Sequence, residues 1–126
     1  MNERILVVED TEAILDAVTD ALAAEGFEVQ GTSNGKQGLE AAEAEPFDLV
    51  ILDLMLPDTD GYAVSENLRR QYHSCMVPIL MLTARTQSTE KLYGFGAGAD
   101  AYMTKPYDAA ELLGTIRQLL KDAGID

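Results

Sequence analysis

Five side chains suited to phosphate chemistry each lie just after a short apolar run or a weaker strand candidate. They are Glu9 and Asp10 after residues 5–8, Asp53 after residues 49–52, Thr83 after residues 79–82, and Lys105 after residues 101–104. Three carboxylates in one cleft would repel each other, so either one of them holds a proton or a hard cation binds. Mg²⁺ suits such a site because it prefers oxygen ligands, keeps several waters and often binds a substrate phosphate.

The same groups are suited to transfer of a phosphoryl group onto a carboxylate. Asp53 could act as the nucleophile, while Mg²⁺ and Lys105 would offset the charge on the transferred group and Thr83 could donate a hydrogen bond. Each residue also has an ordinary structural interpretation: Asp10 or Thr11 could cap a helix, and a lone lysine is commonly a surface residue. The functional hypothesis rests on the combination, because four of the five predicted strands end in such a group.

Two kinds of apolar pattern alternate along the chain and predict the elements that position these groups. Continuous apolar runs at residues 5–8, 49–52 and 79–82 are typical of parallel strands covered on both faces, and residues 27–31 and 101–104 are weaker strand candidates. Apolar residues at helical spacing follow each strand, at positions 14–22, from about 35 to 42, 63–68, 92–95 and 112–120.

This β-α order, repeated five times, predicts a single α/β domain over residues 1–126. Right-handed crossovers favour a doubly wound, flavodoxin-like fold with a five-stranded parallel sheet in the order 2-1-3-4-5. Such sheets bind ligands outside the carboxyl ends of their strands, where all five candidate side chains are expected.

The composition excludes several classes of partner. With 22 acidic and 9 basic residues the net charge is −13, which argues against direct binding of nucleic acid or anionic membranes. It is compatible with a divalent cation or a basic partner surface. The single cysteine, Cys75, rules out an internal disulfide and favours a cytoplasmic setting. The apolar run at residues 5–8 is too short for a signal peptide or a membrane span.

Five stretches, in order and at matching spacing, carry a resemblance that covers essentially the whole chain. They are Ile5–Asp10, Asp48–Pro57, Asp60–Gly61, Leu82–Arg85 and Gly98–Pro106. In these stretches the chain resembles the receiver domain of bacterial two-component response regulators. Any one stretch is weak evidence, but five together are highly specific.

The resemblance implies a phosphorylation-activated signalling switch that is not a conventional enzyme. Asp53 would accept a phosphoryl group from a sensor histidine kinase or a phosphotransfer protein. Asp10 would bind Mg²⁺ directly, Glu9 would act largely through water, and the backbone carbonyl of Met55 would be a further ligand. Lys105 would pair with Asp53 and then with the phosphoryl group.

The resemblance also implies how the signal would leave the site. Thr83 would move to the phosphoryl oxygen and let Tyr102 swing inward, and the Lys105–Pro106 bond would be cis, which only an X-Pro bond allows cheaply. The surface of the fourth helix, fifth strand and fifth helix would then control an output domain or partner, with a weak homodimer possible on phosphorylation. On this surface the chain keeps the charges of Asp100 and Arg117.

Other functions remain as alternatives. A haloacid-dehalogenase-type phosphatase would need an acid where this chain has Met55, and a calcium loop around Gly61 would need acids at Leu56 and Asn67. Residues 94–99 superficially fit a dinucleotide-binding glycine pattern but neither follow a predicted strand nor open a helix. A degenerate receiver or a flavodoxin-like binding module, using the fold only for binding, is the remaining alternative.

Overall fold

The computed structural model describes residues 2–83, 98–105 and 107–125 of the 126-residue chain. Five strands and four helices lie in these ranges. They are β1 (Arg4–Val8), α1 (Glu12–Ala24), β2 (Glu28–Thr32), α2 (Gly35–Ala44), β3 (Leu49–Asp53), α3 (Gly61–Leu68), β4 (Ile79–Thr83), β5 (Ala101–Thr104) and α5 (Ala109–Asp122). The helix predicted around residues 92–95 lies outside the described residues.

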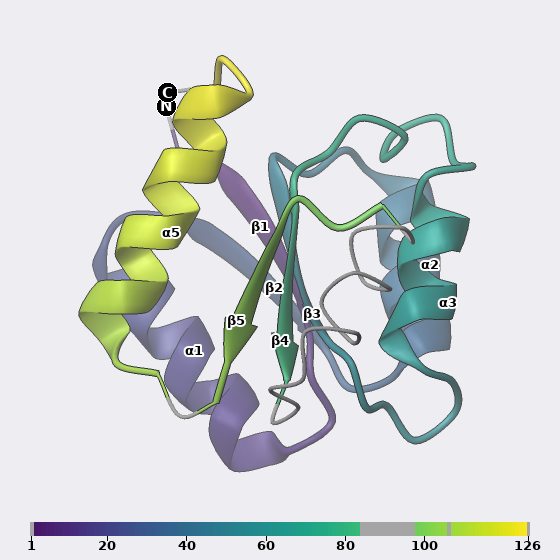
Figure 1. Cartoon of the computed structure of the whole chain (residues 1–126), viewed down its shortest axis with the longest axis horizontal. Coiled ribbons are helices and arrows are strands. Elements are labelled where there is room, and N and C mark those ends of the chain that lie inside the picture. Colours follow the sequence, from purple (N-terminus) through teal and green to yellow (C-terminus); the bar gives the residue numbers. More distant parts are fainter. Residues whose placement is uncertain (1, 84–97, 106, 126) are drawn as a thin grey trace.

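The strands form one parallel sheet in the order β2-β1-β3-β4-β5, which confirms the predicted doubly wound fold. Helices α1 and α5 cover one face of the sheet, and α2 and α3 cover the other (Figure 1). The three continuous apolar runs became the central strands β1, β3 and β4, because strands covered on both faces need apolar side chains at every position.

The core is split into two layers by the alternation of side chains along each strand. In β1, Ile5 and Val7 pack towards α1 and α5, whereas Leu6 and Val8 pack towards α2 and α3. All four side chains are almost completely buried. The sheet is therefore packed tightly on both faces, and this packing fixes the strand ends that carry the candidate site residues.

Three of the helices begin at a side chain that accepts a hydrogen bond from the first turn. These capping residues are Asn34, Asp60 and Asp108. Thr11 holds the corresponding position before α1, but its side chain makes no capping bond there. Asp10, beside it, is exposed and is not the cap of this helix, which leaves its carboxylate available for another role.

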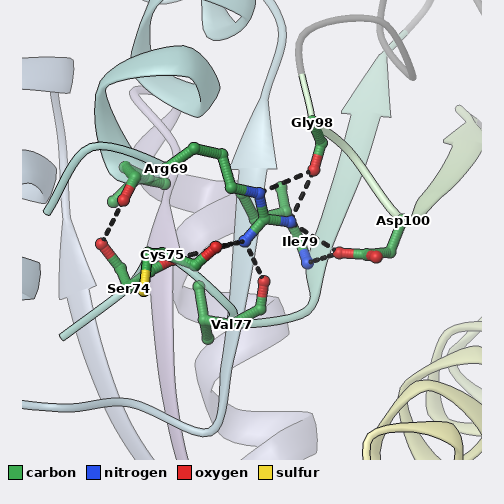
Figure 2. A network of polar contacts seen from close by, with 8 residues as sticks. Arg69, Ser74, Cys75, Val77, Ile79, Gly98 and Asp100 are labelled. Carbon is green, nitrogen blue, oxygen red and sulfur yellow. Dashed lines mark hydrogen bonds and ion pairs between the residues drawn. The ribbon is translucent and has the colours of Figure 1, made fainter. Parts of the chain in front are cut away.

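A polar network joins the loops at the amino ends of β4 and β5 (Figure 2). The guanidinium of Arg69, just after α3, donates to the carbonyls of Ser74, Val77 and Gly98 and pairs with Asp100. Gly98 has a φ of 100°, a conformation that glycine adopts most readily. The network fixes the chain where it enters β5, at the end of the sheet opposite to the candidate site.

Candidate active site

Strand register places two of the predicted acids at the same level of the sheet. Val8 of β1 pairs with Leu52 of β3, so the next residues, Glu9 and Asp53, lie side by side. Asp53 is the last residue of β3 rather than the first residue after it. The carboxylates of Glu9 and Asp53 are both buried, with 3% and 6% of each residue exposed.

The neighbouring strands bring the other two groups to the same edge. Thr83 ends β4 and pairs with Thr104 of β5. The backbone N–H of the next residue, Lys105, donates to the Thr83 carbonyl at 2.7 Å. Thr83 is 1% exposed, so its hydroxyl lies inside the edge of the sheet and not on an open surface.

Lys105 connects the two buried carboxylates. Its Nζ lies 3.0 Å from Glu9 Oε1 and 3.3 Å from Asp53 Oδ2. The other oxygen of Asp53, Oδ1, accepts a hydrogen bond from the backbone N–H of Met55 at 3.0 Å. The side chain of Asp53 is thereby fixed from two directions.

The three acids are close enough to share one cation. One oxygen from each of Glu9, Asp10 and Asp53 lies within 4.8 Å of the others. Glu9 Oε2 is buried and accepts no hydrogen bond from the described residues while Glu9 is ionised. A hard divalent cation with its waters would satisfy this oxygen and offset the repulsion, so the residues fit Mg²⁺.

The cluster shifts the pKa values of its members. The pKa of Glu9 is raised to about 7, first by burial and then by a hydrogen bond that its protonated form donates to Asp53; Lys105 opposes this only in part. Burial alone would lower the pKa of Lys105, but the hydrogen bond to Glu9 and the charges of Asp53 and Glu9 raise it. Near neutral pH, Lys105 is therefore a cation and Glu9 is only partly ionised.

The remaining predicted residues lie nearby, each in a different setting. Met55 has an exposed side chain and bonds to Asp53 through its backbone N–H; its carbonyl as a metal ligand stays a prediction. Tyr102 in β5 is half-buried and packs against the core layer facing α2 and α3. The Lys105–Pro106 bond, predicted to be cis, lies outside the described residues because Pro106 does.

Sequence reasoning missed a groove beside the site. It lies between α1 and α5, has a volume of about 460 Å³ and is mainly apolar. Lys105 and Tyr107 line one end of it, with Ile14, Val18 and Leu112 among the apolar residues. The sequence feature that could have predicted the groove is a row of small residues on α1, spaced four apart: Ala13, Ala17 and Ala21. Their short side chains leave room between the two helices.

This site and fold have clear counterparts among known proteins. A model of the response regulator receiver domain matches residues 5–117. The chain belongs to this family. Among curated relatives, this receiver is 44% identical over 118 residues to the DNA-binding dual master transcriptional regulator RpaA of Synechocystis, and 42% identical over 125 residues to the alkaline phosphatase synthesis transcriptional regulatory protein PhoP of Bacillus subtilis.

These matches cover 94% and 99% of the receiver but only 49% and 51% of the relatives. The chain therefore spans about half the length of the curated relatives that it matches. Among solved structures, a CheY-like receiver from Methanospirillum hungatei superimposes with a TM-score of 0.93 at 32% identity, covering 98% of both chains. The receiver of sensor histidine kinase PA1611 from Pseudomonas aeruginosa, with magnesium in its active-site cleft, gives 0.89 at 29% identity, covering 96% of this chain and 99% of that one.

The alternatives are not favoured. Family membership, together with acids, hydroxyl and lysine at one edge, speaks against a degenerate receiver or an unrelated flavodoxin-like binding module. None of the helices in the described ranges has the length and apolar character needed to cross a membrane.

Proposed function

We propose that residues 1–126 form a receiver domain that accepts a phosphoryl group on Asp53 in a Mg²⁺-dependent reaction. The observation that carries the proposal is the contact of Lys105 with both Asp53 and Glu9, with Asp10 completing a three-carboxylate cluster. The magnesium ion in the cleft of the PA1611 receiver supports the choice of cation. Glu9, Asp10, Asp53 and the carbonyl of Met55 would hold it.

The chain's own residues account for the transfer. A carboxylate oxygen of Asp53 attacks phosphorus, the bond from phosphorus to the donor's imidazole nitrogen breaks, and the electron pair stays on that nitrogen. Bound Mg²⁺ would offset the negative charge on the oxygens of the transferred phosphoryl group. Lys105 changes its partner from a carboxylate oxygen of Asp53 to an oxygen of the phosphoryl group. The Thr83 hydroxyl donates a hydrogen bond to another phosphoryl oxygen.

In this proposal the domain is a signalling switch that catalyses only its own phosphorylation and slow dephosphorylation. The donor would be a sensor histidine kinase or a phosphotransfer protein in the cytoplasm. Tyr102 would respond to Thr83, and the surface around β5 and α5 would control an output domain or partner. The net charge of −13 supports a domain that does not itself bind DNA, although the relatives' names describe transcriptional regulators.

Labelling with acetyl phosphate and Mg²⁺ tests the assignment of Asp53. Intact-mass spectrometry should show one added phosphoryl group per chain for the wild type and none for Asp53→Asn or after EDTA treatment. Asp48→Asn, at the opposite end of β3, is the matched control and should label normally. Unchanged labelling of Asp53→Asn would show that another residue accepts the group.

A further inference from the structure

The loop between β3 and α3, residues 54–60, is tied to the start of a different helix. Its Asp58 carboxylate accepts a hydrogen bond from Gly35 N–H at 2.9 Å through Oδ1 and from Lys36 N–H at 3.0 Å through Oδ2. These are backbone donors of the first turn of α2, which have no partner within their own helix. The two bonds also lower the pKa of Asp58, so the carboxylate is ionised at neutral pH.

Close packing accompanies these hydrogen bonds. A Cβ atom on Gly35 would lie 2.4 Å from Thr59 Cγ2 and 2.9 Å from Val64 Cγ2, much closer than such atoms approach. The loop and α3 therefore rest directly on the backbone at the start of α2. Asn34 already caps the same helix by accepting from Gln37 N–H at 2.8 Å, so Asp58 is not its sole cap.

The other end of the same loop is bound to the phosphoacceptor. Met55 N–H donates to Asp53 Oδ1, and Met55 forms an isolated antiparallel bridge with Asp60. Gly61 N–H donates to the Leu54 carbonyl at 2.6 Å, which closes the loop. A displacement of Asp58 would therefore be transmitted over a short, closed stretch of backbone to Met55.

We propose that Asp58 is a positioning residue: by fixing the loop to the amino end of α2, it holds the Met55 backbone where the metal site needs it. The inference rests on the proposed function, in which the Met55 carbonyl is a Mg²⁺ ligand. Among the described residues, the carboxylate cluster consists of Glu9, Asp10 and Asp53 without Asp58, whose carboxylate bonds to α2, so Asp58 would act through the loop. Partners that orient metal ligands commonly affect affinity by about 10- to 100-fold.

Calorimetric Mg²⁺ titration at pH 8 tests this with a matched pair of variants. Asp58→Ala removes a cap of α2 together with the tie to the loop, whereas Asn34→Ala removes a cap of the same helix and leaves the tie. Both variants should lower the urea unfolding midpoint by similar amounts. Only Asp58→Ala should weaken Mg²⁺ binding, by about 10-fold.

A third variant separates position from charge. Asp58→Asn keeps one of the two acceptor oxygens, and so one of the two hydrogen bonds from the α2 backbone, but removes the negative charge; its Mg²⁺ affinity should therefore recover part of the loss seen in Asp58→Ala. Equal losses in Asp58→Asn and Asp58→Ala would overturn the inference by showing a charge effect. Equal affinities in Asp58→Ala and Asn34→Ala would overturn it as well. Absence of Mg²⁺ binding by the wild type would instead remove the proposed function, and the inference with it.

Discussion

The guanidinium of Arg69 lies 2.8 Å from the carboxylate of Asp100, 31 residues further along the chain. The same carboxylate oxygen accepts from the backbone N–H of Ile79 at 2.9 Å, at the start of β4 (Figure 2). Asp100 is thus a junction between the end of α3 and the two strands β4 and β5. Its charge, which the sequence places on a candidate interaction surface, is already paired within the chain.

Arg69→Met should lower the free energy of unfolding by about 2 kcal/mol or more, since the charge-assisted hydrogen bonds to several carbonyls and Asp100 are lost together. Arg70→Met is the matched control, because the Arg70 guanidinium reaches only Asn67, at 3.4 Å, among the described contacts. It should change stability by less than about 0.5 kcal/mol. Urea unfolding of both variants measures the difference, and equal effects would show that the network contributes little.

Self-association should be weak. Arg117, the other charge noted on this surface, pairs with Glu25 at 3.6 Å and lies over the Phe27 ring, so a cross-chain pair with Asp100 would have to compete with contacts in each monomer. We expect the protein to be a monomer without phosphate and to dimerise weakly with beryllofluoride. An exposed ion pair contributes about 0.2–1 kcal/mol, so Arg117→Ala should change the dissociation constant of the dimer by less than about tenfold. Sedimentation velocity decides, and a tight dimer in both states would contradict this prediction.

Replacement by alanine should have opposite effects on stability at two glycines, Gly61 and Gly114. A Cβ on Gly61 would lie 2.7 Å from the Asp53 carbonyl oxygen and 2.7 Å from Leu54 Cα, which are backbone atoms of the proposed phosphoacceptor and of the residue after it. Gly61→Ala should therefore destabilise the fold by about 1–3 kcal/mol. Gly114→Ala, at an exposed position in α5 with open space around it, should stabilise it by about 0.5–1 kcal/mol. Urea unfolding compares the two, and a stable Gly61→Ala would show that the loop shifts easily.

The raised pKa of Glu9 predicts how stability depends on pH without metal. Because the folded pKa is about 7 and the ordinary value is 4.5, the contribution of protonated Glu9 is complete below pH 4.5 and is lost as the pH rises through 7. In EDTA, Glu9→Gln should melt above the wild type at pH 8, and the gap should close towards pH 4.5. Saturating Mg²⁺ at pH 8 should raise the melting temperature of the wild type more than that of the variant. A gap that does not change with pH would contradict the shift.

The sequence by itself determined the sheet and the set of chemical groups at its edge. Continuous apolar runs identify buried parallel strands, and the chirality of β-α-β connections leaves few ways to order them. Glu9, Asp53 and Lys105 could be predicted to meet because parallel strands of similar length end together. These inferences need only local patterns and general rules of chain connection.

Only the tertiary structure decided how that edge is held and charged. The tie from Asp58 to α2 and the close packing of Gly61 against Asp53 hold this edge, and the pairing of Arg69 with Asp100 holds the opposite end of the sheet. Each of these contacts joins residues that are not neighbours in the sequence, and no local pattern predicts it. The pKa of Glu9 likewise depends on how deeply the carboxylate is buried and on its distances from Asp53 and Lys105. Hydrogen bonding, packing and electrostatics act over a few ångströms, so they are set by the folded arrangement of distant residues.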